Sequence, residues 1–323
     1  MNQALKPLAP FESGLAFSEQ LVASAREYAA SAKADRTKRL YAAAWRTFTS
    51  WCEAQGVSPL PAPPAAVALF LAARADEGRK AATLSLELVA ISQAHKAAGV
   101  ASPRTAAEVQ TVLKGIRRSK GVAQTKKAPV LVPELRKMVT GLPATTIGLR
   151  DRALLLLGFA GAFRRSELIS LAVDDVVFTT DGLEVMLRRS KTDQEGAGQK
   201  IGIPFGSDPA TCPVRSLRKW IDAAELKEGR LFRSVNRHGH VAGSLTGHGV
   251  ALTVKRAAER AGLDPVKYSG HSLRAGLATS AAKAGKQERI IAKQTRHRSI
   301  AVLRGYIRDA ELFTENAATG IGL

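Results

Sequence analysis

The chain has 323 residues, of which 45% are hydrophobic, and its formal net charge at pH 7 is +20. Its length allows two hydrophobic cores, and a positive charge of this size favours a polyanionic partner such as nucleic acid. No run approaches the roughly 18 apolar residues of a membrane span, and the start lacks the pattern of a secretory signal. We therefore expect a soluble, cytoplasmic protein with no membrane partner.

The distribution of charge and the spacing of the cysteines indicate which partners and which compartment to expect. Lys and Arg are in excess both in residues 1–129 and in the remainder, whereas a disordered basic tail would concentrate them at one end. Cys52 and Cys212 lie far apart and lack CxxC spacing, which argues against a disulfide framework or a zinc site. We expect nucleic acid to contact both parts of the chain, and we expect two buried thiols in a reducing compartment.

Residues 16–120 predict a small bundle of about five helices. Alanine-rich windows at 18–33 and 36–56 carry apolar residues three and four positions apart, and Gly56 suits the end of the second. The proline-rich stretch PLPAPPAA then interrupts the helical pattern. Further helices are expected near residues 65–77, 80–98 and 105–119.

A change of composition marks the domain boundary. GVAQTKKAP, residues 121–129, has Gly, Pro and two lysines but no apolar period, which is typical of an extended basic linker. We therefore predict a helical domain at 1–120 and a second domain, with a C-terminal tail, at 130–323.

In the second domain, the spacing of apolar residues changes from a helical pattern to the alternating pattern of strands. After helices near 133–141 and 147–159, Leu183, Val185 and Leu187 alternate with other residues, and QKIGIPF repeats the pattern after TDQEGAG. This predicts a β-hairpin with a long turn. Helices are expected again near residues 213–226, 247–261 and 272–284.

Motifs for nucleotide and metal chemistry are missing from the sequence. AKAGKQ lacks the first glycine and the Ser/Thr of a phosphate loop, and GAGQKIG misses GxGxxG by one residue. There is no HExxH, and the neighbours Asp174 and Asp175 point to different faces. We expect no metal and no ATP or NAD, and therefore no cofactor.

Two segments place cationic side chains in apolar settings. In GFAGAFRRSELISL, Arg164 lies three residues before Glu167, and such a pair is equally an ordinary structural ion pair. In YSGHSLRAGLATS, His271 and Arg274 lie one turn apart at a helix start, where backbone N–H groups also favour an anion. Neither segment identifies a reaction by itself.

The segment QTRHRSIAVLRGYIRD places Tyr306 nine residues after His297. Ser299 suits the N-cap of a helix, and the apolar face of that helix would carry Ile300, Leu303 and Ile307. Taken alone, Tyr306 is better explained as a half-buried packing tyrosine beside this face.

Together, these side chains suit attack on a phosphodiester without a metal. The planar fork of arginine binds two phosphate oxygens and offsets the charge of a pentavalent transition state. A histidine exchanges a proton near pH 7, and a phenol in a cationic pocket loses its proton more readily. A lysine can protonate the leaving 5′ oxygen.

In this order, GFAGAFRRSELISL, SGHSLRAG and RHRSIAVLRGYI resemble the three signature boxes of the tyrosine recombinase (phage integrase) family. The likeness extends to SPRTAAEVQTVLKGIRRSKG and RRSKTDQEGAG, so it covers nearly the whole chain, although the first hundred residues match mainly by helical pattern. The resemblance implies a mainly α fold with a small antiparallel β-sheet. It implies a helical core-binding (SAM-like) domain and a mixed α/β catalytic domain that form a C-shaped clamp around double-stranded DNA.

The family motif carries roles onto individual residues. Arg164 matches the first catalytic arginine and Glu167 the acid that braces the pocket. Arg165 stands where the family usually has an apolar residue, and the spacing of three from Glu167 favours Arg164 as the phosphate ligand. Lys191 matches the hairpin lysine that acts as general acid, with Lys200 on the returning strand as the alternative.

The remaining boxes complete the predicted catalytic set. His271 and Arg274 match the HxxR pair, His297 the later histidine and Tyr306 the nucleophile. The resemblance implies a site-specific DNA recombinase or integrase that works through a covalent 3′-phosphotyrosyl intermediate, as a homotetramer on two DNA sites. Other readings are a catalytically inactive DNA-binding protein of the same fold, a type IB topoisomerase or a telomere resolvase. The sequence does not indicate whether accessory proteins take part.

Contacts outside the pocket are also predicted. The C-terminal tail is a candidate for docking on a neighbouring subunit through Leu312, Phe313 and Ile321, or for fraying at the chain end. Candidates for DNA contacts are Arg36, Arg39, Arg46, Arg117, Arg118, Lys126 and Lys127.

Overall fold

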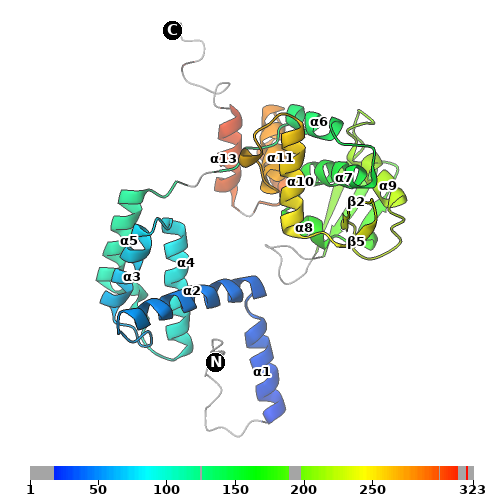
Figure 1. Ribbon diagram of the computed structural model, residues 1–323. Coiled ribbons are helices and arrows are strands. Elements are labelled where there is room, and N and C mark those ends of the chain that lie inside the picture. Colours follow the sequence, from blue (N-terminus) through cyan, green and yellow to red (C-terminus); the bar gives the residue numbers. More distant parts are fainter. Residues whose placement is uncertain (1–17, 124–125, 189–197, 298, 312–317, 319–323) are drawn as a thin grey trace. The chain divides into compact units, whose positions relative to one another are not determined.

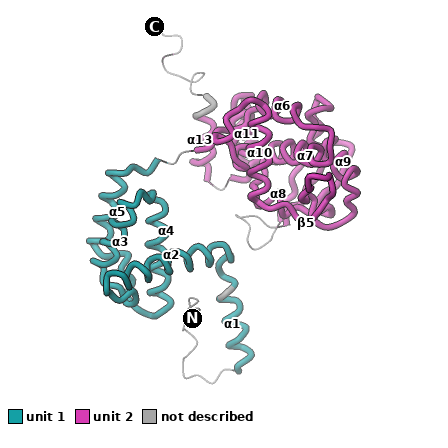
Figure 2. The backbone as a smooth tube through the Cα atoms, viewed as in Figure 1, with its two compact units in different colours: residues 1–125 teal, residues 126–323 magenta. Residues whose placement is uncertain are grey.

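The structure is a computed structural model that describes residues 18–123, 126–188, 198–297, 299–311 and 318 (Figure 1). The chain divides into two compact units, residues 1–125 and residues 126–323 (Figure 2). Among the described residues, no helix is both long and apolar enough to cross a membrane.

Unit 1 is a helical bundle. The predicted stop at Gly56 is a residue with φ of +68°, a backbone conformation that glycine adopts without steric cost, just beyond the end of the second helix. Pro64 opens the third helix at the position where a missing N–H costs nothing. Its helices, which follow the predicted windows, are α1 (Glu19–Ser31), α2 (Asp35–Ala54), α3 (Pro64–Asp76), α4 (Ala81–Ala97) and α5 (Ala107–Lys120), with a short 3-10 helix at Pro103–Thr105.

The core of unit 1 is aromatic and contains one buried histidine. The rings of Phe48 and Phe70 meet edge to face, with centroids 5.1 Å apart. His95 is fully buried, and its Nε2 accepts a hydrogen bond of 2.9 Å from the backbone N–H of Ala62. Cys52 is buried as predicted, and burial raises the pKa of its thiol to about 11. These side chains pack in the core of the bundle and are not accessible to solvent.

Unit 2 combines helices with two small antiparallel sheets. The first sheet has the strand order β1 (Val176–Phe178), β2 (Gly182–Leu187), β3 (Gln199–Pro204), and the second pairs β4 (Arg233–Val235) with β5 (Val241–Ser244). The helices are α6 (Val132–Thr140), α7 (Thr146–Ala160), α8 (Arg165–Ser170), α9 (Pro213–Ala223), α10 (Gly247–Arg260), α11 (His271–Lys283), α12 (Glu288–Thr295) and α13 (Ile300–Glu311).

The predicted hairpin is present as β2 and β3. Leu183, Val185 and Leu187 are buried while Met186 between them is exposed, which confirms the alternating pattern, and Val185 pairs with Ile201. The sequence analysis missed β1 and the β4–β5 pair, because strands of three or four residues are too short to show a period.

The helix α7 is the centre of unit 2. It contacts α6, α9, α10 and α11, and consecutive leucines from Leu154 to Leu157 are all buried, as expected for a helix covered on every side. Trp220 of α9 is also buried, and its indole N–H donates a hydrogen bond of 2.8 Å to the carbonyl of Leu231. This packing gives α11 and the end of α7 a rigid support.

Gly276 lets α11 approach the strand-like segment that enters unit 2. A Cβ at this position would lie 1.9 Å from the carbonyl oxygen of Val130. The N–H of Val130 donates a hydrogen bond of 2.9 Å to the carbonyl of Ser272 in the same helix. The first turn of α11 is therefore fixed by a backbone contact that no larger residue allows.

We predict that Gly276→Ala destabilises unit 2 by about 1–3 kcal/mol, because the added methyl group displaces α11 from Val130. The matched control is Gly115→Ala in α5, where no atom lies within 4 Å of the new Cβ. That change is expected to stabilise unit 1 by up to about 1 kcal/mol through helix propensity. Urea unfolding measures both, and equal midpoints for Gly276→Ala and the wild type would contradict the packing argument.

Candidate active site

The turn between α7 and α8 carries backbone groups to which the side chains of the candidate site bind. Phe163 is fully buried and anchors the turn, while Ala162 adopts a left-handed backbone with φ of +46°. Arg164 precedes α8, and its backbone N–H donates a hydrogen bond of 2.8 Å to a carboxylate oxygen of Glu167 in the first turn of that helix. The carbonyl groups of this turn, those of Gly161 and Ala162, accept hydrogen bonds from arginines of later segments.

Arg164 and Glu167 form the ion pair that the spacing predicted. Nη1 of Arg164 lies 2.5 Å from Oε1 of Glu167, whose side chain is 1% exposed. Burial raises the pKa of Glu167, but the charge of Arg296 and the hydrogen bonds from Arg164 lower it more, so the net shift is downward. Glu167 is therefore a carboxylate at neutral pH. Arg165 is exposed and does not share this contact.

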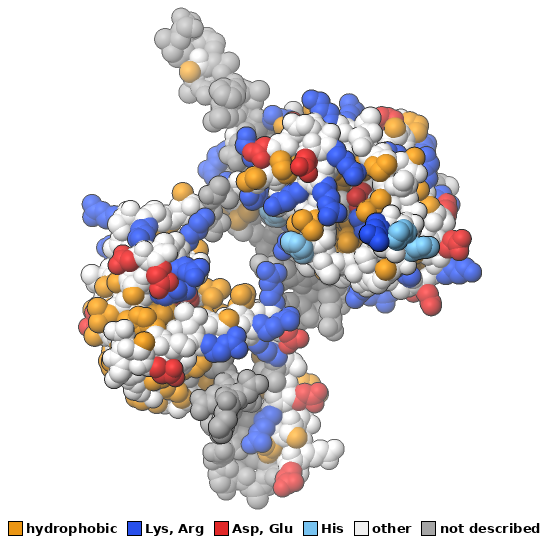
Figure 3. Space-filling model, in the orientation of Figure 1, with side chains coloured by type: hydrophobic (Ala, Val, Ile, Leu, Met, Phe, Trp, Pro, Cys, Tyr) orange, Lys and Arg blue, Asp and Glu red, His pale blue; other side chains and the backbone are white. Residues whose placement is uncertain are grey.

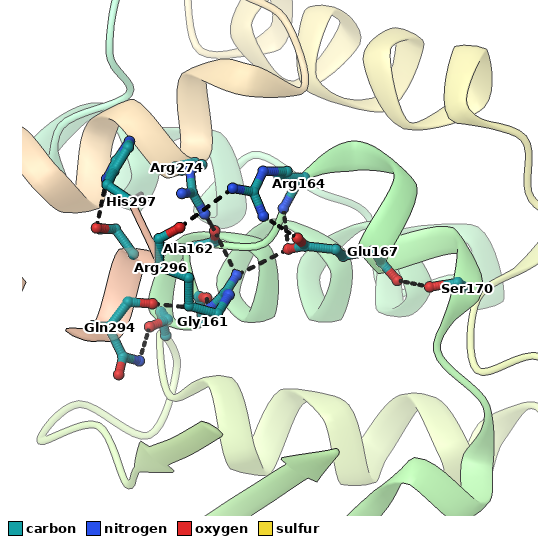
Figure 4. Close-up of polar contacts among 11 residues, drawn as sticks. Gly161, Ala162, Arg164, Glu167, Ser170, Arg274, Gln294, Arg296 and His297 are labelled. Atoms are coloured by element: carbon teal, nitrogen blue, oxygen red, sulfur yellow. Dashed lines mark hydrogen bonds and ion pairs between the residues drawn. The ribbon is translucent and has the colours of Figure 1, made fainter. Parts of the chain in front are cut away.

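Arg274 lies in the first turn of α11, and its side chain is buried. Nη1 donates a hydrogen bond of 2.8 Å to the carbonyl of Ala162, whereas buried Nη2 has no hydrogen-bond partner in the described part of the chain (Figure 4). Burial, reinforced by the charges of Arg164 and Arg296, lowers the pKa of Arg274 to about 9. A buried cation with an unused donor is a site that an anion stabilises.

His271 and Tyr306 face one another across α11 and α13. Nε2 of His271 lies 3.0 Å from the hydroxyl oxygen of Tyr306. Partial burial, followed by the charges of Arg274 and Arg164, lowers the pKa of His271 below its usual range. The ring is therefore neutral near pH 7 and can accept a proton through Nε2 when Nδ1 carries the hydrogen.

His297 is held by a threonine hydroxyl. Oγ1 of Thr295 donates its hydrogen to the carbonyl of Ile291 at 2.6 Å, so it acts as acceptor toward Nδ1 of His297 at 2.7 Å. This assigns the hydrogen of a neutral His297 ring to Nδ1 and leaves Nε2 as the other functional nitrogen. Burial, followed by the charge of Arg274, lowers the pKa of His297 to about 4.

Tyr306 lies at the edge of a small hydrophobic cluster on α13. The cluster includes Leu303, which is fully buried, and Ile307, which is partly buried. Ile300, predicted for the same face, begins the helix and is 39% exposed. The centroids of the Tyr306 and His297 rings are 5.9 Å apart, so the phenol packs against the cluster and also reaches the polar site.

Arg296 is a member of the site that the sequence analysis missed. Its Nη2 lies 2.9 Å from Oε2 of Glu167 and 3.1 Å from the carbonyl oxygen of Ala162. Nη2 of Arg164 donates a hydrogen bond of 3.3 Å to the carbonyl of Arg296. In the sequence, the arginine directly before His297 looks like one more basic residue of a basic segment, and no spacing signal marks it.

The structure therefore gathers most of the predicted set in unit 2. Lys191 lies outside the described residues. Lys200, the alternative, is on β3 and forms an ion pair of 2.8 Å with Glu184 of β2, with both side chains partly exposed. The residues that come together are Arg164, Glu167, His271, Arg274, His297 and Tyr306.

The candidates for DNA contacts are exposed side chains. Nη2 of Arg117 also donates a hydrogen bond of 3.1 Å to the hydroxyl of Ser85, and Nζ of Lys127 donates one of 2.7 Å to the carbonyl of Val266. The amino group of Lys126 lies 3.9 Å from the place of a Cβ at Gly305 in α13. Figure 3 shows Lys and Arg side chains spread over the drawn faces of both units.

Two further expectations concern other parts of the molecule. Leu312, Phe313 and Ile321 of the tail lie outside the described residues. In the described ranges, no group of three or more His, Cys, Asp or Glu side chains is arranged to hold a metal ion.

Comparison with known proteins places the chain in a family. A model described as Phage integrase family matches residues 131–312, which is more than half of the chain. An integrase/recombinase XerD homolog of Selenomonas ruminantium is 39% identical over 305 residues, covering 93% of this chain and 89% of the relative. The chain belongs to the phage integrase family. The recombinase Cre of Escherichia phage P1 is 22% identical over 298 residues, covering 86% of this chain and 85% of Cre.

Solved structures show that the fold is the integrase fold. The XerH site-specific recombinase bound to a palindromic difH substrate superposes with a TM-score of 0.63, at 17% identity, over 94% of this chain and 84% of XerH. A lambda integrase dimer bound to a core site has a TM-score of 0.56, at 17% identity, over 90% of this chain and 94% of that chain. The predicted family, the mainly helical fold class and the class of tyrosine-type site-specific recombinase are confirmed.

For this integrase, we predict that the ring of His297 titrates near pH 4 and is protonated on Nδ1 when neutral. An unfolded histidine binds a proton near pH 6.5, so protonation favours the unfolded chain, and stability falls as the pH drops from about 6.5 to 4. Side-chain ¹⁵N NMR measures the pKa and the tautomer. Unfolding of His297→Gln should show a shallower loss of stability over that pH range, and a wild-type titration near pH 6.5 would contradict the assignment.

Proposed function

We propose that this integrase cleaves and rejoins DNA at specific sites through a covalent 3′-phosphotyrosyl intermediate formed by Tyr306. The observation that carries the proposal is the approach of the Tyr306 hydroxyl to within 3.0 Å of Nε2 of His271, in the site where the buried Nη2 of Arg274 has no partner among the described residues. A nucleophile, a proton acceptor and an anion-binding donor are then within one constellation.

The chemistry is a phosphoryl transfer between two oxygen nucleophiles. The Tyr306 oxygen forms a bond to phosphorus while the bond from phosphorus to the 5′ oxygen breaks, and the phenol proton passes to Nε2 of His271. One phosphodiester is exchanged for another of similar energy, so no ATP is required. The arginine forks of Arg164 and Arg274 would hold the non-bridging oxygens and offset the charge that develops on them.

His297 and Lys191 complete the proposed mechanism. A bound phosphate supplies the negative charge that raises the pKa of His297 from its low value, so that Nε2 can donate a hydrogen bond to a phosphate oxygen. Lys191 is proposed to protonate the leaving 5′ oxygen, on the strength of the family motif. The ion pair between Lys200 and Glu184 supports this choice over the alternative, because it holds the amino group of Lys200 on a carboxylate of β2.

DNA is the proposed partner, and two kinds of observation support it. Among structures that share this fold, XerH is bound to a palindromic difH substrate, the lambda integrase dimer to a core site and the Tn1549 transposon integrase to transposon right end DNA. The net charge of +20 is suited to a phosphate backbone. We propose that the helical unit and the catalytic unit close around duplex DNA as a C-shaped clamp, that four copies act on two DNA sites in the cytoplasm, and that no metal is needed.

The first test is Tyr306→Phe. The wild-type protein should become attached to a 3′ phosphate in nicked suicide duplexes drawn from a random library and from inverted repeats beside its gene, whereas Tyr306→Phe should bind the same duplexes without attachment. Tyr268→Phe, the same change at a largely buried tyrosine of unit 2, is the control and should attach at about the wild-type rate. Denaturing gels measure attachment, and attachment by Tyr306→Phe would overturn the assignment.

The same duplexes separate the alternatives. An inactive DNA-binding protein would give no attachment by the wild type. A type IB topoisomerase would relax supercoiled plasmid without a defined site, and a telomere resolvase would leave hairpin ends. Exchange between two sites on one plasmid, read by restriction mapping, is the outcome expected for a recombinase.

Lys191→Ala tests the general acid. It should slow cleavage of normal DNA by about 100-fold or more, because proton transfer to the leaving group is lost. A substrate with sulfur in place of the scissile 5′ oxygen has a leaving group that needs no proton, so the same variant should cleave it at nearly the wild-type rate. Lys200→Ala is the matched control, and rescue of that variant in place of Lys191→Ala would transfer the role to Lys200.

A further inference from the structure

Arg296 occupies an unusual position for a cationic side chain. It follows α12 with φ of +55°, a left-handed conformation that residues with a Cβ seldom adopt. Its side chain is nonetheless directed inward and is almost completely buried. A backbone conformation of higher energy and a desolvated charge are both unfavourable, so the contacts of this side chain must offset them.

The contacts of Arg296 are nearly all with groups that shape the candidate site. Nη1 donates hydrogen bonds of 2.9 Å to the carbonyl of Gly161 and of 2.8 Å to the carbonyl of Gln294. Nη2 donates to the carbonyl of Ala162 and to Oε2 of Glu167. The guanidinium also lies 5.3 Å from the centroid of the Phe163 ring. Arg296 thus joins the end of α12 to the turn before α8 (Figure 4).

Both proposed phosphate ligands are connected to this side chain. Arg164 binds Oε1 of Glu167 while Arg296 binds Oε2, so the carboxylate is held from two sides. Arg164 also donates to the backbone carbonyl of Arg296. The carbonyl of Ala162 accepts one hydrogen bond from Arg274 and one from Arg296. A shift of that carbonyl would therefore displace the guanidinium of Arg274.

We propose that Arg296 is a positioning residue: by holding Glu167 and the carbonyls of Gly161 and Ala162, it fixes the guanidinium groups of Arg164 and Arg274 where the scissile phosphate binds. The inference rests on the proposed function, because it concerns the placement of the phosphate ligands. Arg296 itself uses its fork on protein groups and does not contact the DNA.

Charge gives a second reason for this role. Arg164, Arg274 and Arg296 surround one carboxylate, so the buried cluster holds more positive than negative charge before DNA arrives. Without Arg296, Glu167 would have Arg164 as its remaining arginine partner in the described contacts. The carboxylate would then draw Arg164 toward itself, and both the position and the effective charge of that phosphate ligand would change.

The test compares three variants of Arg296 in the full-length protein. Arg296→Gln removes the charge, Arg296→Lys keeps the charge but not the planar fork, and Arg296→Gly removes the side chain while easing the left-handed backbone. On nicked suicide DNA, we expect Gln and Gly to slow attachment by about 100-fold, and Lys to be intermediate, because small displacements of positioned groups have large effects on rate.

A second substrate separates positioning from general support of the fold. A methyl group in place of one non-bridging oxygen removes the negative charge of the scissile phosphate, so correctly placed arginines matter less. If Arg296 acts through Arg164 and Arg274, Arg296→Gln should lose much less rate on methylphosphonate DNA than on normal DNA. Arg164→Lys, a change to a residue of the proposed site, should show the same pattern.

The matched control is Arg150→Gln in α7. Arg150 is also a buried arginine that binds a carboxylate, Asp151, and a carbonyl, that of Arg233, but its hydrogen bonds in the described residues involve no group of the site. Its loss should lower the melting temperature of the protein and change attachment by the same factor on both substrates. It therefore shows what loss of a buried ion pair does without an effect on the phosphate ligands.

The outcomes distinguish this inference from the proposed function. Absence of attachment by the wild type would overturn the proposed function and the inference with it. Attachment by the wild type together with an unchanged rate for Arg296→Gln and Arg296→Gly would overturn the inference alone. Equal losses for Arg296→Gln on normal and methylphosphonate DNA, as expected for Arg150→Gln, would also overturn it.

Discussion

The rest of the site depends on the ion pairs that the buried carboxylate of Glu167 forms with Arg164 and Arg296. A carboxylate with 1% exposure is strongly disfavoured unless it is paired and hydrogen-bonded, and here Arg164 and Arg296 each take one of its oxygens. The same group caps α8 through the N–H of Arg164. One acidic side chain thus sets the start of a helix, the direction of one proposed phosphate ligand and the end of α12. The basic groups around it converge because this acid is fixed.

The site combines buried like charges with left-handed backbone at two residues, both of which are unfavourable. Burial, reinforced by the charges of neighbouring cations, lowers the pKa values of Arg274 and His297 to about 9 and about 4, and Nη2 of Arg274 is buried with no partner in the described chain. Ala162 and Arg296 both adopt left-handed backbones. Such features are unfavourable for folding and are expected where a site is preorganised for a charged ligand. The arrangement therefore favours the binding of an anion at the expense of the stability of the folded protein.

The scaffold keeps these groups in place through packing that is local to unit 2. The helix α7 is buried on all sides and ends at the turn that bears the site carbonyls, and Gly276 holds α11 against Val130 at a distance that excludes any side chain. The helix α13, which bears Tyr306, is attached differently. Tyr306 packs against a small cluster around Leu303 that is separate from the main core of unit 2.

The sequence by itself determined the features that depend on local pattern or on order along the chain. Helices such as α2 and the hairpin around Val185 follow from periodicity, and the spacing of Arg164 from Glu167 follows from one helical turn. Tertiary structure alone decided the strand β1, the pairing of Lys200 with Glu184 and the contact of Arg296 with Glu167. Arg296 and Glu167 are 129 residues apart, and the sequence around Arg296 does not indicate this carboxylate as its partner. The contact exists only once the residue after α12 lies against the turn before α8.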